Sequence, residues 1–344
     1  MPRSDDQSEQ GGLEFHKETP PEEPAFTLSP LRTYTSPQVL HTSTSPPCIR
    51  DPPTTTHLLT PPQAIGQIRS TASMTHNLTQ CTTLIQRASA LGAAALFLPE
   101  AADYIASSAD ETLSLARPLT TSPFVLGLRA AAKKHNLPLS VGIHEPTPSG
   151  AKVLNTLLWI DASGTIAHRY TKLHLFDVAI ADGPTLQESA SVERGVRIED
   201  PVATPLGKVG MLICFDLRFP EVGVALRNRG AQVLVYPSAF TVPTGKAHWE
   251  ALLRARAIET QSYVVAAAQV GFHNEEETRR SYGHSMVVDP WGRVVAELGG
   301  EEDEKGRGLD VGEIALAEID LEYLEKIRRE VPLLRRTDVY PELT

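Results

Sequence analysis

The stretch 209–220 is the part of the chain best suited to covalent chemistry. A short apolar run ends at Cys214, and Pro220 then opens a helical pattern, which predicts a buried strand, a sharp turn and a helix start. The amide groups of such a turn and the positive end of the helix stabilise a thiolate, the reactive form of cysteine. The sequence therefore predicts a nucleophile at Cys214, while a core cysteine packed like a small hydrophobe is the alternative.

Two charged residues, Glu100 and Lys172, each come shortly after an expected strand. Sites of open α/β sheets lie at the C-terminal ends of strands, so these two side chains and Cys214 are expected to meet. Glu100 would take the thiol proton, and Lys172 would lower the pKa of the thiol and bind a developing oxyanion together with the amide of Phe215. Taken one at a time, each charged residue could instead be solvated at the edge of a sheet.

The segments that must position these residues alternate between strand and helix patterns from Ala64 onward. The first half is expected to hold strands at 64–68, 93–98, 139–144, 155–160 and 165–170, with one helix capped by Thr75 and another over 122–135. The second half is expected to hold strands at 207–213, 232–236, 263–270, 283–288, 293–298 and 313–319, with helices at 220–229, 246–261 and 321–329. Two halves of this order predict an α/β fold, a four-layer αββα sandwich of two mixed sheets with helices outside.

Composition and charge exclude several classes of protein. The chain has 344 residues, 41% of them apolar and 22% charged, which is typical of a globular protein. Its net charge of −10 disfavours binding to nucleic acid or to an acidic membrane, and no stretch is apolar enough to span a bilayer. The 3 cysteines have neither metal-ligand nor redox spacing, which indicates a reducing compartment. The acidic N-terminus shows no leader, so a cytoplasmic location is expected, with a mitochondrial one as the alternative.

Residues 1–62 differ from the rest of the chain. They contain 12 of the 27 prolines and show neither helical nor strand periodicity. Such a segment buries too little apolar surface to offset the entropy cost of ordering it. The sequence therefore predicts a disordered, Pro/Thr-rich N-terminal tail over 1–62 and a single folded domain over 63–344.

Three motifs connect the candidate site to a known family. They occur at 96–101, 170–177 and 210–221, in the order in which the nitrilase (carbon–nitrogen hydrolase) superfamily carries them. On these motifs the chain resembles that superfamily from about residue 64 to about residue 340. The resemblance implies that the folded part, 63–344, is a carbon–nitrogen hydrolase domain.

The resemblance also implies a role for each motif residue. Glu100 is similar to the general base of the family, Lys172 to its oxyanion-stabilising lysine and Cys214 to its nucleophile. The pair Glu188-Ser189 is similar to a second family glutamate, whose expected role is to hold Lys172 in register. The implied reaction is acyl transfer from an amide through a cysteine thioester, with no cofactor and no metal. Members of the superfamily form homodimers or larger homo-oligomers, so self-association is expected.

The stretches 236–240 and 282–292 resemble the Nit branch of the superfamily, for which two activities are expected. One is hydrolysis of the amide of deaminated glutathione, a metabolite-repair reaction from which release of ammonia is expected. The other is an ω-amidase acting on α-ketoglutaramate or α-ketosuccinamate, and a catalytically idle scaffold of the same fold is a third hypothesis. The segment from Gln269 to His284 is short, which favours the hydrolysis of deaminated glutathione.

The expected substrate is therefore a small amide that carries carboxylate groups. Arg279 is a candidate to pair with such a carboxylate, because a guanidinium suits bidentate binding, while a solvated basic pair with Arg280 is the alternative. Tyr104, Tyr236 and Trp249 are candidate walls of the pocket, or else core aromatics. Neither nucleic acid nor a membrane is expected as a partner.

Overall fold

In a computed structural model of the protein the described residues are 61–179, 185–300 and 311–342. They belong to one compact unit of the chain, residues 57–344. The predicted disordered tail, 1–62, lies outside the described residues except for its last two prolines, so it stays a prediction. None of the described helices combines the length and the apolar character needed to cross a membrane.

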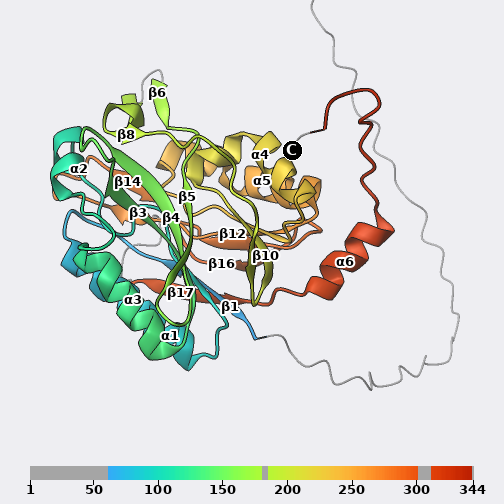
Figure 1. Ribbon diagram of the computed structural model, residues 1–344, viewed down its shortest axis with the longest axis horizontal. Helices are drawn as coiled ribbons and strands as arrows, with labels where there is room; N and C mark the ends of the chain where they lie inside the picture. The colour runs from blue at the N-terminus through green and yellow to red at the C-terminus, as the bar shows by residue number, and fades with distance from the viewer. Residues whose placement is uncertain (1–60, 180–184, 301–310, 343–344) are drawn as a thin grey trace, which may run out of the picture. The chain divides into compact units, whose positions relative to one another are not determined.

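The first sheet contains strands from the first half of the folded part together with one late strand (Figure 1). Its order is β17-β1-β2-β3-β4-β5, with the short β8 paired to β4. Strands β1, β2 and β3 are parallel, and the other neighbours along this order are antiparallel. The bounds are β1 Gln63–Gln67, β2 Leu96–Phe97, β3 Leu139–Pro146, β4 Val153–Ile160, β5 Ile166–Thr171, β8 Val192–Glu193 and β17 Glu313–Ala317.

The second sheet is built from later strands in the order β16-β15-β12-β11-β10-β9. Strands β10, β11 and β12 are parallel at its centre, and the outer strands pair antiparallel. The bounds are β9 Val202–Thr204, β10 Gly207–Met211, β11 Val233–Val235, β12 Tyr263–Ala266, β15 Met286–Val288 and β16 Val294–Glu297.

The main apolar core lies between the two sheets. It joins Ile65 and Phe97 of the first sheet to Val209 and Val233 of the second. Another core lies between the first sheet and helices α1 and α3, while α4 and α5 pack on the second sheet. The predicted α/β sandwich is therefore confirmed. The helix bounds are α1 Met74–Ala90, α3 Pro123–His135, α4 Pro220–Asn228, α5 Val242–Thr260 and α6 Leu321–Glu330.

Local sequence features explain where the helices begin. Ser73 caps α1 by accepting a hydrogen bond from the amide of His76, so the prediction of Thr75 as the cap is wrong. Helix α5 begins four residues earlier than predicted, because Pro243 suits a first turn. The sequence did not predict α2 (Ala109–Leu115), which has only 7 residues and no buried face that periodicity could reveal.

Two short hairpins that the sequence did not predict carry candidate site residues. The predicted strand 263–270 splits, because the chain leaves the second sheet after β12 and continues as β13, which pairs with β14. The loop between β13 and β14 holds Arg279, and Glu188 follows the hairpin of β6 and β7 in the short 3-10 helix η1. The bounds are β6 Asp177–Ala179, β7 Thr185–Gln187, η1 Glu188–Ala190, β13 Val270–Phe272 and β14 Arg280–Tyr282.

Candidate active site

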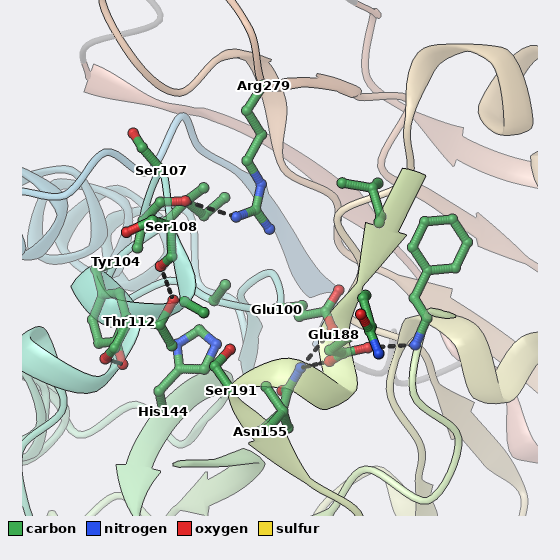
Figure 2. A pocket seen from close by; sticks show the side chains of 18 of the residues that line it. Glu100, Tyr104, Ser107, Ser108, Thr112, His144, Asn155, Glu188, Ser191 and Arg279 are labelled. Carbon is green, nitrogen blue, oxygen red and sulfur yellow. Dashed lines mark hydrogen bonds between the residues drawn. The ribbon is translucent and has the colours of Figure 1, made fainter. Parts of the chain in front are cut away.

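The segment after β2 carries Glu100 across β3. The amide of Gly142 in β3 donates to the carbonyl of Pro99 at 3.0 Å, and the amide of Ala102 donates to the carbonyl of Gly142 at 2.8 Å. A Cβ atom on residue 142 would lie 2.6 Å from Glu100 Cα, so this close approach requires glycine. Ala101 is in the left-handed region, with φ of 53°. The resulting turn places the Glu100 carboxylate in the cavity shown in Figure 2.

Four polar side chains from separate elements meet beside this turn. Lys172, directly after β5, donates from Nζ to Glu100 Oε1 at 2.9 Å and to the two oxygens of Glu188 at 2.9 and 3.0 Å. Asn155 of β4 donates from Nδ2 to Glu100 at 2.8 Å and to Glu188 at 3.1 Å (Figure 2). Lys172 is 2% exposed. The structure thus brings three predicted residues together and adds Asn155, which sequence reasoning missed.

Cys214 begins the 3-10 helix η2 (Cys214–Arg218) just after β10. Its φ of 43° is unusual for a residue other than glycine, and such strained positions concentrate at functional sites. The amide of Cys214 donates to the carbonyl of Pro237 at 3.0 Å, which ties the turn to the chain after β11. Cys214 and Glu100 line the same cavity, and the Glu100 charge acts on the thiol, so the predicted nucleophile and the predicted base lie close together. Phe215 is the next residue in the same turn.

Asp216 links the cysteine turn to the segment that carries Lys172. Its fully buried carboxylate accepts hydrogen bonds from Tyr170 Oη at 2.6 Å and from the amide of Ile213 at 3.0 Å. It also accepts from the amide of His174 at 3.0 Å, and the His174 ring lies 2.8 Å away. Tyr170 and His174 flank Lys172 in the chain, so one carboxylate fixes the distance between lysine and cysteine. Sequence reasoning missed Asp216, although it lies inside the third motif.

Burial and charge determine the protonation states of the three central groups. Burial alone would raise the pKa of Glu100, but the charge of Lys172 and hydrogen bonds from Lys172 and Asn155 lower it. Burial alone would lower the pKa of Lys172, but Glu100 and Glu188 raise it well above its usual value. Burial and the Glu100 charge raise the pKa of the Cys214 thiol, and Lys172 offsets them only in part. Lys172 thus lowers the pKa of the thiol as expected, but less than burial and Glu100 raise it, and Cys214 rests as a thiol beside a carboxylate.

A cavity of about 240 Å³ opens onto Glu100, Lys172 and Cys214, and both Tyr104 and Arg279 line it. The hydroxyl of Tyr104 donates to a carbonyl of α2, so its ring forms part of the wall rather than a reactive group. Within the described parts of the chain, no group of three or more His, Cys, Asp or Glu side chains is arranged to hold a metal ion.

Tyr236 and Trp249 do not line this cavity. Both are buried in the core beside the second sheet. The hydroxyl of Tyr236 accepts a hydrogen bond from Arg256 at 2.8 Å, and the indole of Trp249 donates to the carbonyl of His284 at 2.8 Å. Each aromatic residue therefore satisfies its polar atom inside the fold, and the expectation that they form pocket walls is corrected to the core alternative.

A second, much smaller hollow, of about 10 Å³, also opens onto Cys214. It is lined by Phe215, Phe240 and Arg218, and by two threonines, Thr241 and Thr244. Nη2 of Arg218 lies 2.9 Å from the ring of a histidine in α5, whereas its Nε is buried and has no hydrogen-bond partner among the described residues. The Arg218 side chain is half-buried, and a guanidinium with an unused donor can bind an anion. Sequence reasoning missed Arg218, although it lies four residues after the predicted nucleophile.

Comparisons with known proteins agree with this geometry. Residues 64–329 match the family described as carbon–nitrogen hydrolase. The chain is 47% identical over 281 residues to "Probable hydrolase nit2" of Schizosaccharomyces pombe, covering 81% of this chain and 99% of that protein. It is 46% identical over 286 residues to "Deaminated glutathione amidase" of Homo sapiens, covering 81% and 84% of the two chains. The crystal structure of the Caenorhabditis elegans NitFhit protein matches with a TM-score of 0.74 and 43% identity, covering 82% of this chain and 67% of that one.

Proposed function

Because the chain belongs to the Nit branch of the carbon–nitrogen hydrolase family, and is thus a hydrolase acting on amide C–N bonds, we propose that it cleaves deaminated glutathione through a thioester at Cys214. One observation carries the proposal: Cys214 lines the same cavity as Glu100, whose carboxylate Lys172 holds at 2.9 Å. Nucleophile, base and cation therefore share a single cavity.

The first step forms the S–C bond. The thiol rests protonated, and the Glu100 carboxylate is ionised, because Lys172 and its hydrogen bonds keep its pKa low. As the Cys214 sulfur attacks the carbonyl carbon, the thiol proton moves to Glu100 and the C=O π electrons move to the oxygen. Lys172 Nζ donates to Glu100 and to both oxygens of Glu188, which holds its positive charge beside the reacting carbonyl. That charge stabilises the oxyanion, with the Phe215 amide as a hydrogen-bond donor.

The second half of the reaction returns every group to its starting state. Glu100 gives its proton to the leaving nitrogen as the C–N bond breaks, which leaves a thioester on Cys214. Water then attacks the thioester and loses a proton to Glu100. The C–S bond breaks, and the proton on Glu100 returns to the sulfur. Glu100 serves as base and acid in turn, and Lys172 remains charged throughout.

The structure of deaminated glutathione corrects one expectation. Replacing the α-amino group of glutathione by an oxo group gives a 2-oxoglutaryl group joined through its distal carboxyl to the amino group of cysteinylglycine. The amide of this substrate is therefore secondary, and its hydrolysis releases the dipeptide and 2-oxoglutarate. Ammonia would leave only from a primary amide such as α-ketoglutaramate.

The hollow beside Arg218 has a volume of about 10 Å³, so it would have to widen to take the acyl portion of either substrate. Both substrates share the 2-oxoglutaryl group, which ends in a carboxylate. The unused Nε donor of Arg218 and the hydroxyls of Thr241 and Thr244 are suited to that carboxylate, and Phe215 and Phe240 are suited to the methylene groups. We infer that Arg218 anchors the acyl group while Cys214 attacks at its other end.

Release of 2-oxoglutarate tests the proposal. Purified full-length protein is offered deaminated glutathione and α-ketoglutaramate, and kcat/KM is measured for both. We expect deaminated glutathione to be the better substrate, Cys214→Ser to abolish turnover without changing the melting temperature, and the matched control Cys81→Ala to retain it. A preference for α-ketoglutaramate would establish the ω-amidase alternative. No turnover, with Cys214 no more reactive to iodoacetamide than Cys81, would support the scaffold hypothesis.

A further inference from the structure

We propose that the cavity on the Glu100 side of Cys214 is a subsite for the leaving amine, in which Arg279 binds a carboxylate that this amine carries. The inference rests on the proposed function and narrows its substrate class. It predicts amides whose amine portion is acidic at its far end, as a short peptide is, rather than primary amides.

Proton transfer determines which side of Cys214 takes the amine. Glu100 must reach the leaving nitrogen, so the amine portion extends into the cavity that Glu100 lines. The second hollow is lined by Phe215 and Arg218 but not by Glu100; its volume is about 10 Å³, so it would have to widen to take the acyl portion. Among the described residues lining the first cavity, Lys172 and Arg279 carry the fixed positive charges. Lys172 is already occupied by two carboxylates, so Arg279 is the available cation.

Arg279 extends into this cavity from the loop between β13 and β14 (Figure 2). Its guanidinium makes one hydrogen bond to the described residues, from Nη1 to the carbonyl of Ala106 at 2.8 Å. The residue is exposed, so its remaining N–H donors can reach a ligand. A guanidinium with two free donors on one edge binds a carboxylate in the bidentate geometry that lysine cannot offer.

Hydrogen bonds brace the loop that carries Arg279. Asn274 Oδ1 accepts from the amides of Thr278 and Arg279 at 3.1 and 3.3 Å. The amide of His273 donates to the carbonyl of Arg279 at 2.9 Å, and the buried His273 ring lies 2.8 Å from the carbonyl of Ser70. An arginine on a braced loop loses less conformational entropy on binding than one on a mobile loop.

The charges in the cavity indicate why a cation is needed there. Glu100 and Glu188 carry two negative charges against the single positive charge of Lys172, so a second substrate carboxylate would face a net negative surface. Desolvation lowers the pKa of Arg279, the charges of Glu100 and Glu188 oppose that shift, and the charges of the four side chains sum to zero. A substrate with an acidic amine portion can then enter without net repulsion.

His144 supplies a second polar contact in the same cavity. Its Nδ1 lies 3.0 Å from the Asp103 carboxylate, and its amide donates to that carboxylate at 2.8 Å. The ring of Tyr104 stacks on the imidazole, with centroids 4.6 Å apart. These contacts hold the ring in one orientation and leave Nε2 as the nitrogen available to a ligand. Arg279 and His144 together form the proposed leaving-amine subsite.

A matched pair of substrates tests the subsite. Deaminated glutathione and its C-terminal carboxamide share the acyl group and the scissile amide, and they differ only in the charge at the far end of the amine. We expect wild-type protein to favour the carboxylate form by at least about tenfold in kcat/KM. Arg279→Gln should reduce that preference to about twofold or less, and Arg279→Lys should leave an intermediate value because lysine cannot bind in bidentate fashion.

Arg280→Gln is the matched control. The Arg280 guanidinium lies 4.4 Å from the centre of the Phe272 ring and does not line the cavity, so its loss should preserve the wild-type preference. The wild-type comparison needs no variant and so does not depend on folding. Equal rates for the two amides, or a preference that survives Arg279→Gln, would overturn the subsite and leave the proposed function standing. Hydrolysis of neither amide would overturn both.

Discussion

Replacing Glu188 by glutamine removes one negative charge beside Lys172 and keeps the size of the side chain. The Glu188 carboxylate accepts all of its hydrogen bonds from N–H groups. Lys172 Nζ donates to both oxygens, Asn155 Nδ2 donates to Oε1, and the amide of Phe176 donates to Oε2 at 2.6 Å. Whichever oxygen the amide NH2 group replaces, it faces two donors. Glu188→Gln therefore loses at least two hydrogen bonds, one of them with the ammonium group.

The expected size of the effect follows from those contacts. A hydrogen bond to a charged group contributes about 1.5–3 kcal/mol. Lys172 stabilises the transition state in which the oxyanion forms. Each 1.4 kcal/mol or so of that stabilisation that is lost lowers the rate about tenfold. We therefore expect kcat to fall by about 10- to 100-fold. KM should change by less than about threefold, because Glu188 holds the lysine rather than the substrate.

Steady-state kinetics with deaminated glutathione, together with a thermal melt, would measure this effect. The matched control is Glu199→Gln, which removes the same charge from an exposed pair with Arg197 and should change neither kcat nor the melting temperature appreciably. A Glu188→Gln enzyme with the kcat of the control would refute the argument that this carboxylate positions Lys172.

Three further predictions concern the framework of the site. Asn155→Ala removes a hydrogen bond that lowers the pKa of Glu100. Since the base must be ionised, activity is lost as pH falls through that pKa, and the acid limb of the kcat/KM profile should therefore move to higher pH in the variant. An acid limb at the wild-type position would contradict the assignment of Glu100 as the base. Asp216→Asn leaves a buried donor such as the amide of Ile213 unpaired, and urea denaturation should show a loss of about 1–3 kcal/mol in unfolding free energy together with slower iodoacetamide labelling of the nucleophile. Gly142→Ala places a methyl group 2.6 Å from Glu100 Cα, and denaturation should show a cost of about 1–3 kcal/mol with a loss of kcat, whereas wild-type values would show that the turn adapts.

Local patterns were sufficient for much of the fold. Apolar runs such as 207–213 predict buried strands because a strand between two packed layers contacts apolar groups on both faces. Periodic helices were predicted for the same reason, with errors of a few residues where a cap such as Ser73 fixes the start. The hairpins β6–β7 and β13–β14 were missed because strands of three residues carry too little periodicity to be seen.

The sequence by itself determined the family and the α/β sandwich, and it gave Glu100, Lys172, Glu188 and Cys214 as candidate site residues, because strand ends and motifs are local features of the chain. Only the tertiary structure decided the protonation states of those residues. The turn by itself favours the thiolate form of Cys214, whereas burial and the neighbouring Glu100 raise the thiol pKa, and both of these effects depend on segments distant in sequence. Packing likewise turned Tyr236 and Trp249 inward and placed other polar residues beside the site, because the direction of a side chain is set by what surrounds it in three dimensions. The residues it added are Asn155, Asp216 and Arg218.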